Sequence, residues 1–165
     1  MSTKKVKFNH KDRFFMNLAI NLASERSGLT GENPSVGCVI VKKNRVISMG
    51  KTGLNGRPHA EYNAIKSSIE RLKGSKLYVS LEPCTHYGKT PPCSNIIIKS
   101  KIKEVIFSIE DIDKRTKSKS YKIFRNNNIK VRSGVLLKKA KKIYQFFIYN
   151  KNKNLPFVTG KLAVS

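Results

Sequence analysis

The sequence predicts an α/β domain in which helices cover both faces of a central mixed sheet, giving a three-layer α/β/α architecture. Short β-branched runs of strand length alternate along the chain with segments whose apolar residues recur at helical spacing. The chain has 165 residues, the length of one ordinary domain with one main core. Its hydrophobic fraction of 39% and charged fraction of 27% are typical of a folded globular chain.

The first predicted element is an amphipathic helix over residues 10–27. Phe14, Leu18 and Leu22 recur at helical spacing, and Gly28 lies just beyond them as a C-terminal stop. We expect the apolar face of this helix to pack on the core.

A hairpin and a second helix are predicted next. The apolar runs 36–41 and 46–49 have strand length, and the short turn between them favours antiparallel pairing. A glycine-rich loop over 50–58 then leads to a predicted helix from about 59 to 71, which Gly74 ends.

The second half of the chain continues the alternation of strands and helices. Three further strands are predicted: 76–81, where the residue types alternate, and the short runs 105–109 and 129–131. Two prolines prepare a helix that starts at Cys93, because proline is tolerated where the first amides have no helical partner. Two more helices are predicted, one around Ile123 and Phe124 and one over 136–149.

Net charge is the strongest feature of the composition. The chain has 34 basic and 10 acidic residues, a formal net charge of +24. Such a charge often indicates nucleic-acid binding. However, 26 of the basic residues are lysine and only 8 are arginine, whereas reading of bases favours the planar arginine fork. We interpret most of the charge as a solvated surface and do not expect nucleic acid as the main partner.

The cysteine count and the hydropathy pattern indicate the compartment. The three cysteines Cys38, Cys84 and Cys93 are an odd, small set that does not make a disulfide framework, so we expect a reducing, cytoplasmic location. No uninterrupted apolar run approaches the roughly 20 residues of a membrane span, so no membrane partner is expected. Cys38 lies inside an apolar strand and is predicted to be a small core residue.

Four residues carry the chemistry that the sequence predicts: His59, Glu61, Cys84 and Cys93. One imidazole and two thiolates suit Zn²⁺, and three protein ligands leave a fourth tetrahedral position for water. Glu61 lies two residues from His59 at a helix start, so it can approach that water without binding the metal. Its expected role is to take a proton from water and deliver it to a departing amine. Glu82 is predicted to be a structural, hydrogen-bonding carboxylate.

Three motifs occur in order along the chain. They are Asn33-Pro34 followed by the run 36–41, the run from Gly56 to Glu61, and the run from Tyr78 to Cys93. A His-x-Glu motif followed by Pro-Cys is shared by zinc deaminases. In that motif two residues usually separate the two cysteines, whereas eight separate Cys84 and Cys93 here. The longer spacing narrows the identification to one family within the zinc deaminases. The chain resembles the riboflavin-biosynthesis pyrimidine deaminases of the cytidine-deaminase-like superfamily.

The resemblance implies a cytidine-deaminase-like fold. It also implies zinc-dependent hydrolytic deamination of 2,5-diamino-6-(5-phosphoribosylamino)pyrimidin-4-one to 5-amino-6-(5-phosphoribosylamino)uracil, a step of riboflavin biosynthesis. In this family His59, Cys84 and Cys93 would hold zinc and Glu61 would move the protons. Contacts to the phosphorylated pyrimidine are implied for four residues: Asn33, His86, Lys89 and Asp111.

The chain departs from the family pattern after the fourth predicted strand. The family usually continues Asp-Pro-Asn-Pro there, whereas residues 111–116 of this chain are Asp-Ile-Asp-Lys-Arg-Thr. The contacts to ribose and phosphate in this loop are therefore left open. Lys114, Arg115 or Lys117 are the candidates for the phosphate.

The C-terminal end resembles the opening strand of the reductase domain that follows in the bifunctional enzymes, over residues 156–165. We therefore expect a deaminase domain over 1–150 and a C-terminal segment over 151–165. No NADPH site can be assigned. The pattern fits either a deaminase that works beside a separate reductase or a truncated bifunctional chain.

Two alternative functions stay open. The first is a deaminase of tRNA or another nucleic acid, which the charge and the basic C-terminal third favour but the long cysteine spacing opposes. The second is a catalytically inactive, zinc-stabilised binding domain, which the altered loop after Asp111 and the missing reductase favour. A homo-oligomer is compatible with any of these functions.

Overall fold

The computed structural model describes residues 7–155, 157–160 and 162. These residues form a five-stranded sheet with the strand order β2-β1-β3-β4-β5. Its strands are β1 (Gly37–Lys42), β2 (Arg45–Lys51), β3 (Lys76–Leu81), β4 (Glu104–Ile109) and β5 (Lys130–Ser133). The predicted mixed sheet is confirmed, because β1 is antiparallel to both β2 and β3, whereas β3, β4 and β5 are parallel.

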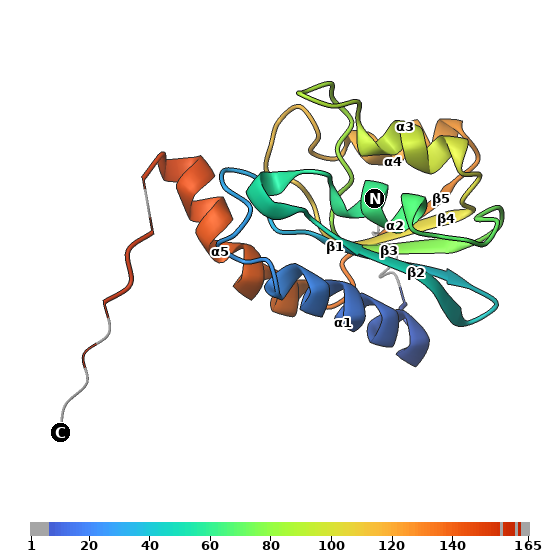
Figure 1. The fold of residues 1–165 in the computed structure, drawn as a ribbon, viewed down its shortest axis with the longest axis horizontal. Coiled ribbons are helices and arrows are strands. Elements are labelled where there is room, and N and C mark those ends of the chain that lie inside the picture. Colours follow the sequence, from blue (N-terminus) through green and yellow to red (C-terminus); the bar gives the residue numbers. More distant parts are fainter. Residues whose placement is uncertain (1–6, 156, 161, 163–165) are drawn as a thin grey trace, which may run out of the picture.

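Helices cover both faces of the sheet, which makes three layers (Figure 1). One face carries α1 (His10–Ser24) and α5 (Leu137–Lys153), and the other carries α2 (Ala60–Lys66), α3 (Cys93–Lys99) and α4 (Lys119–Asn126). α1 packs on β1 and β3, while α2 packs on β1 and β2 from the opposite side. The predicted three-layer fold is therefore confirmed.

The core lies on both faces of the central strands. All six residues of β4 are buried and so are five of the six in β3, because helices cover them from both sides. The edge strands β2 and β5 are partly exposed. Fully buried side chains from both layers include Ile20, Val39, Leu77, Ile97 and Phe107.

A buried polar network ties the start of α1 to the sheet. The carboxylate of Asp12, whose residue is 3% exposed, accepts a hydrogen bond from the hydroxyl of Tyr78 at 2.9 Å. Both terminal nitrogens of Arg132 donate to the same carboxylate, at 2.8 and 3.0 Å. Arg132 Nε also donates to Glu104 at 2.7 Å, so one guanidinium connects α1 with β4 and β5.

The helix predicted over 59–71 is shorter in the structure, because α2 ends at Lys66. The next residues are serines, and the hydroxyl of Ser68 donates to the carbonyl of Glu70 at 3.2 Å. Such side-chain bonds give the backbone an alternative to the helix. Ile69 is fully exposed, so continuing the helix would have buried no apolar surface there. The first helix also ends three residues before its predicted end.

Phe157, beyond the end of α5, packs against side chains of that helix. The helix runs to Lys153, so the predicted domain boundary after residue 150 falls within its last turn. Phe157 lies edge-on to Phe146, with ring centroids 4.5 Å apart, and 5.4 Å from the ring of Tyr149. Residues 157–160 and 162 are not in a strand, and the remainder of 156–165 lies outside the described residues. The division into two domains stays a prediction.

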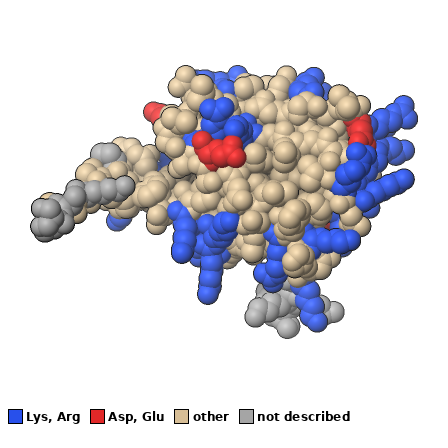
Figure 2. All heavy atoms as spheres, turned by 60° about the horizontal axis from the view of Figure 1, so that its bottom comes forward, with Lys and Arg blue, Asp and Glu red and all other residues tan. Residues whose placement is uncertain are grey.

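Figure 2 shows one face of the molecule, on which Lys and Arg side chains lie in several groups, some of them beside Asp or Glu side chains, with uncharged surface between the groups. The interpretation of the charge as a solvated surface stays a prediction. No helix within the described part of the chain is long and apolar enough to cross a lipid bilayer.

Candidate active site

The site lies at one edge of the sheet, where four segments of the chain meet. The parallel strands β3 and β4 end there, with Leu81 paired to Ile109. Because β1 is antiparallel to β3, it begins at this edge with Gly37, which pairs with Lys51 at the end of β2. The segment before β1 and the segments after β2, β3 and β4 carry all the predicted site residues.

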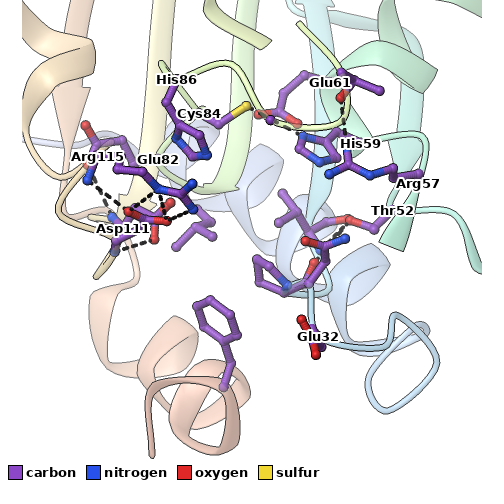
Figure 3. Close-up of a pocket in the computed structure, with 18 of the residues that line it drawn as sticks. Glu32, Thr52, Arg57, His59, Glu61, Glu82, Cys84, His86, Asp111 and Arg115 are labelled. Atoms are coloured by element: carbon purple, nitrogen blue, oxygen red, sulfur yellow. Dashed lines mark hydrogen bonds and ion pairs between the residues drawn. The ribbon is translucent and has the colours of Figure 1, made fainter. Parts of the chain in front are cut away.

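A cavity of about 330 Å³ opens at this edge of the sheet (Figure 3). Seven of the eight predicted site residues line it: Asn33, His59, Glu61, Cys84, His86, Lys89 and Asp111. The eighth, Cys93, is 4% exposed and its Sγ contacts the ring of His59. The fold therefore brings together side chains that are far apart in the sequence.

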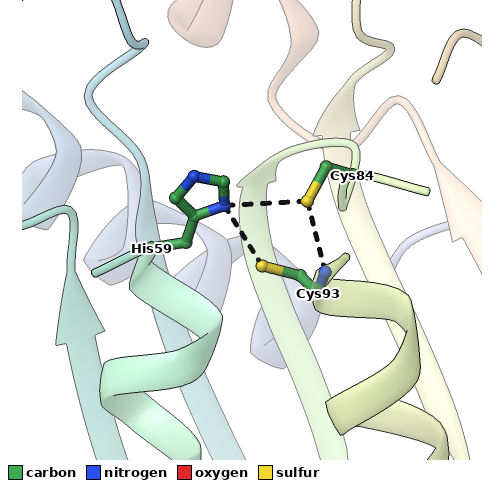
Figure 4. Close-up of side chains that lie close together, drawn as sticks. All are labelled: His59, Cys84 and Cys93. Atoms are coloured by element: carbon green, nitrogen blue, oxygen red, sulfur yellow. Dashed lines mark hydrogen bonds between the residues drawn. The ribbon is translucent and has the colours of Figure 1, made fainter. Parts of the chain in front are cut away.

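His59, Cys84 and Cys93 converge on one point (Figure 4). Nδ1 of His59 lies 3.3 Å from Sγ of Cys93 and 3.6 Å from Sγ of Cys84. One ligand atom from each of the three residues lies within 4.8 Å of the other two. This arrangement could hold a metal ion.

The starts of two helices position these ligands. His59 is the N-cap of α2, and Cys93 is the first residue of α3, directly after Pro92. The backbone N–H of Cys93 donates to Sγ of Cys84 at 3.2 Å, and the N–H of Ser94 donates to the Cys84 carbonyl at 3.1 Å. The hydrogen bond with the Cys93 side chain, followed by the one with His59, lowers the pKa of Cys84 to about 4. The thiolate that this favours is the form that binds metals.

Glu61 lies in the first turn of α2 and is 4% exposed. It lines the cavity beside His59 and Cys84. Burial first, and then the charge of Cys84, raise the pKa of Glu61 from 4.5 to about 7. A carboxyl group with a pKa near neutrality can both accept and donate a proton at physiological pH.

The residues predicted to contact a substrate surround the same cavity. Asn33 donates from Nδ2 to a backbone carbonyl at 3.4 Å, and Nδ1 of His86 lies 3.0 Å from the hydroxyl oxygen of Thr116. Lys89 is exposed at the rim. Asp111 accepts the backbone N–H two residues later at 3.0 Å, and burial raises its pKa to about 6.

Glu82 has the structural role that the sequence predicts. It is 2% exposed and accepts the backbone N–H groups of Asp111 at 3.2 Å, Ser118 at 3.1 Å and Ser120 at 3.3 Å. The hydroxyl of Ser120 donates to it at 2.6 Å. These bonds hold the loop between β4 and α4 against the end of β3. Cys38 is fully buried in β1 and belongs to the core, as predicted.

Sequence reasoning missed part of the cavity wall. Arg57 lines it and donates from Nη1 to Thr90 at 2.6 Å. Phe147 and Lys151 of α5 also line it, although that helix is the last element of the chain. Phe147 and Lys151 follow the buried Tyr144 by three and seven positions, so all three lie on the same face of α5. This helical spacing was the signal in the sequence that could have indicated them.

The three candidates for a phosphate contact differ in the structure. Arg115 belongs to the cavity lining, whereas Lys114 and Lys117 do not. Both lysines are exposed.

The three-layer fold, the His/Cys/Cys group and the buried glutamate at the strand ends define the class of zinc deaminases. Residues 9–109 match the family described as the cytidine and deoxycytidylate deaminase zinc-binding region, and the chain belongs to this family.

The particular relatives are enzymes of riboflavin biosynthesis. The riboflavin biosynthesis protein RibD of Bacillus amyloliquefaciens is 41% identical over 93% of this chain, which spans 42% of that relative. The diaminohydroxyphosphoribosylamino-pyrimidine deaminase of Buchnera aphidicola subsp. Schizaphis graminum is 40% identical over 88% of this chain and is covered over 99% of its length. The predicted resemblance is confirmed.

Solved structures of similar proteins also include an enzyme with this deaminase name. The crystal structure of a diaminohydroxyphosphoribosylaminopyrimidine deaminase/5-amino-6-(5-phosphoribosylamino)uracil reductase from Thermotoga maritima has a TM-score of 0.81 and 43% identity, covering 90% of this chain and 43% of that one. A dCMP deaminase from the cyanophage S-TIM5, with a TM-score of 0.60 and 21% identity, shares the fold. The chain spans less than half the length of the RibD relatives it matches.

Proposed function

We propose that this protein hydrolyses the 2-amino group from 2,5-diamino-6-(5-phosphoribosylamino)pyrimidin-4-one, giving 5-amino-6-(5-phosphoribosylamino)uracil and ammonia. One observation carries the proposal: His59, Cys84 and Cys93 converge next to a cavity whose lining includes the buried Glu61 and the predicted substrate contacts. The Buchnera relative, which carries the name of this deaminase, matches over nearly its whole length.

The donor set fits zinc. In a tetrahedral zinc site, with metal–nitrogen and metal–sulfur bonds of about 2.1 and 2.3 Å, a nitrogen and a sulfur ligand lie about 3.6 Å apart. The separations of 3.3 and 3.6 Å between Nδ1 of His59 and the two sulfurs are close to this value. His59, Cys84 and Cys93 would hold the ion, and zinc, when bound, would supply Lewis-acid activation of water.

Glu61 moves the protons of the reaction. Its carboxylate accepts a proton from the attacking water and, once protonated, donates it to the departing amino nitrogen. One group can serve both steps because its pKa of about 7 leaves both protonation states populated near neutrality. Its burial keeps bulk water from competing for the proton.

The remaining predicted residues orient the substrate. Asn33 would hydrogen-bond the pyrimidine ring from the loop before β1. His86 and Lys89 would face the ring from the cysteine loop, and Thr116 fixes the imidazole of His86. Asp111, which Glu82 holds through its backbone N–H, would contact the ribose.

The experiment is an ammonia-release assay on the phosphorylated diaminopyrimidine, together with a zinc measurement on the purified chain. We expect about one zinc per chain. Glu61→Gln should lower kcat by at least about 100-fold and keep the metal, whereas Cys84→Ser should lose it. Glu70→Gln is the matched control, because Glu70 pairs with Arg45 on the exposed surface. Wild-type turnover by Glu61→Gln would contradict the proposal.

The same assay separates the alternatives. Deamination of an RNA oligonucleotide without action on the free pyrimidine would indicate the nucleic-acid deaminase. A zinc-loaded chain without turnover on either substrate would indicate the inactive binding domain. A cytoplasmic location, a separate reductase and a homo-oligomer stay predictions about the setting of this enzyme.

A further inference from the structure

The cavity has two chemically different ends. At the inner end lie Glu61, His59 and Cys84, beside the buried Cys93. Figure 3 shows Arg115 on the opposite side of the cavity from His59 and Glu61.

Four cationic residues line the cavity: Arg57, Lys89, Arg115 and Lys151. Arg57 lies beside His59, whereas Arg115 lies on the far side of the cavity, near Asp111 and Glu82 (Figure 3). A phosphorylated substrate whose amino group reaches Glu61 would extend its phosphate away from the inner end, which makes Arg115 the candidate on that side.

The guanidinium of Arg115 is held in place. Its Nε lies 3.0 and 3.1 Å from the two carboxylate oxygens of Asp113, and its Nη2 lies 2.6 Å from one of them. The hydrogen bond from Arg115 lowers the pKa of Asp113 to about 2. Nη1 forms no hydrogen bond with the described residues, and the side chain is 64% exposed. Arg115 can thus present a pre-oriented donor at the mouth of the cavity.

Lys151 brings a second cation from a different element. In α5, Tyr144 faces the sheet and its hydroxyl lies 2.6 Å from that of Ser80. Phe147 and Lys151 follow at three and seven positions, so they continue the same face of the helix past the edge of the sheet. Both line the cavity, and Lys151 takes part in no ion pair among the described residues. Lys153, two positions on, lies outside the lining.

We propose that Arg115 and Lys151 together bind the phosphate of the substrate, with Asp113 as the residue that positions Arg115. The proposal rests on the proposed function for the identity of the substrate. A cation from the loop after β4 and a cation from α5 can approach one phosphate from two directions. Binding the phosphate at this wall turns the pyrimidine toward Glu61, so the pair fixes both affinity and orientation.

The first test compares the phosphorylated substrate with its dephosphorylated form. Because hydrogen bonds to charged groups are strong, Arg115→Ala and Lys151→Ala should each raise KM for the phosphorylated substrate about 10- to 100-fold, and leave KM for the dephosphorylated form unchanged. Asp113→Asn should raise the same KM by less, with kcat retained. Lys153→Ala and Lys114→Ala are the matched controls and should behave as wild type. Equal effects on both substrates would overturn the proposal.

The second test does not depend on turnover. Ribose 5-phosphate and ribose are titrated into the full chain by calorimetry, with the same variants. Ribose 5-phosphate should bind more tightly than ribose, and this difference should disappear in Arg115→Ala and Lys151→Ala but persist in Lys153→Ala. If the wild-type chain does not distinguish the two sugars, the phosphate site is wrong even if the chain deaminates. If it does distinguish them but no pyrimidine is turned over, the proposed function fails and the phosphate site stands.

Discussion

Gly50 controls how closely β2 approaches α2, the helix at whose start His59 and Glu61 lie. A Cβ atom at this position would lie 2.4 Å from the carbonyl oxygen of Ala60 and 2.4 Å from the backbone nitrogen of Ala64. Both contacts are with the backbone of α2, so no side-chain rotation can relieve them. Replacing Gly50 by Ala must therefore move α2 relative to the sheet.

The size of the movement follows from the contact distances. Ordinary van der Waals contact for a Cβ begins at 3.4 Å, so α2 must shift by about 1 Å. His59 and Glu61 stand at the start of this helix and would shift with it. A misplacement of this size can cost about 100-fold in rate. Overpacking of a core costs about 1 to 3 kcal/mol in the free energy of unfolding.

We expect Gly50→Ala to lower kcat/KM in the ammonia-release assay by about 100-fold at a temperature where the variant is folded. Circular dichroism and urea unfolding measure its folded fraction and stability. Ile20→Val is the control for stability, because Ile20 is fully buried in α1 on the other face of the sheet and the change costs about 1 kcal/mol. Gly160→Ala is the control for the residue type, since its Cβ would meet no atom within 4 Å.

Wild-type kcat/KM in folded Gly50→Ala would refute this reasoning. So would an equal loss in Ile20→Val, because the effect would then follow stability and not the position of α2.

Three further predictions concern the buried polar groups. Arg132→Leu leaves Asp12 buried without its bidentate partner. In urea titrations the free energy of unfolding should therefore fall by about 3 to 5 kcal/mol, and a loss below about 1 kcal/mol would contradict this expectation. Because burial raises the pKa of Asp111 to about 6, this residue should contribute a loss of up to about 3 kcal/mol in the free energy of unfolding as the pH rises from 4 to 7, in addition to the loss from Glu61. When the melting temperature is plotted against pH, Asp111→Asn should have a flatter curve between pH 4 and 7 than the wild type. An unchanged slope would contradict the raised pKa of Asp111. In Glu82→Gln the side chain can no longer accept all the hydrogen bonds from Ser120 and its neighbours. This variant should lower the free energy of unfolding by about 1 to 3 kcal/mol and raise KM in the ammonia-release assay. Unaltered kinetics would exclude a positioning role for Glu82.

Local patterns in the sequence predicted most of the architecture. The strand around Val39 was visible because a strand buried on both faces is a nearly continuous apolar run, and the strand around Val79 was visible from its alternating residue types. The end of α2 was not visible. Helical periodicity continued past Lys66, whereas the structure ends the helix where serine hydroxyls bond to the backbone and Ile69 has no surface to cover.

For the site, the sequence by itself determined the chemistry, because His59, Glu61, Cys84 and Cys93 stand in motifs whose residue types suit a metal and a proton shuttle. Only the tertiary structure decided which other side chains share the cavity. Lys151 reaches it because α5 packs on β4 and its C-terminal end extends beyond the sheet (Figure 1).

For the charge of +24, too, the sequence and the tertiary structure determine different things. The sequence counts its lysines and arginines, but their effect on an anionic ligand depends on distance and on the direction of each side chain. Lys151 and Lys153 are two positions apart and chemically identical, yet only Lys151 lines the cavity. The motifs therefore determined the family and the proposed reaction class, and the packing of α5 on the sheet decided which of the many cations line the cavity.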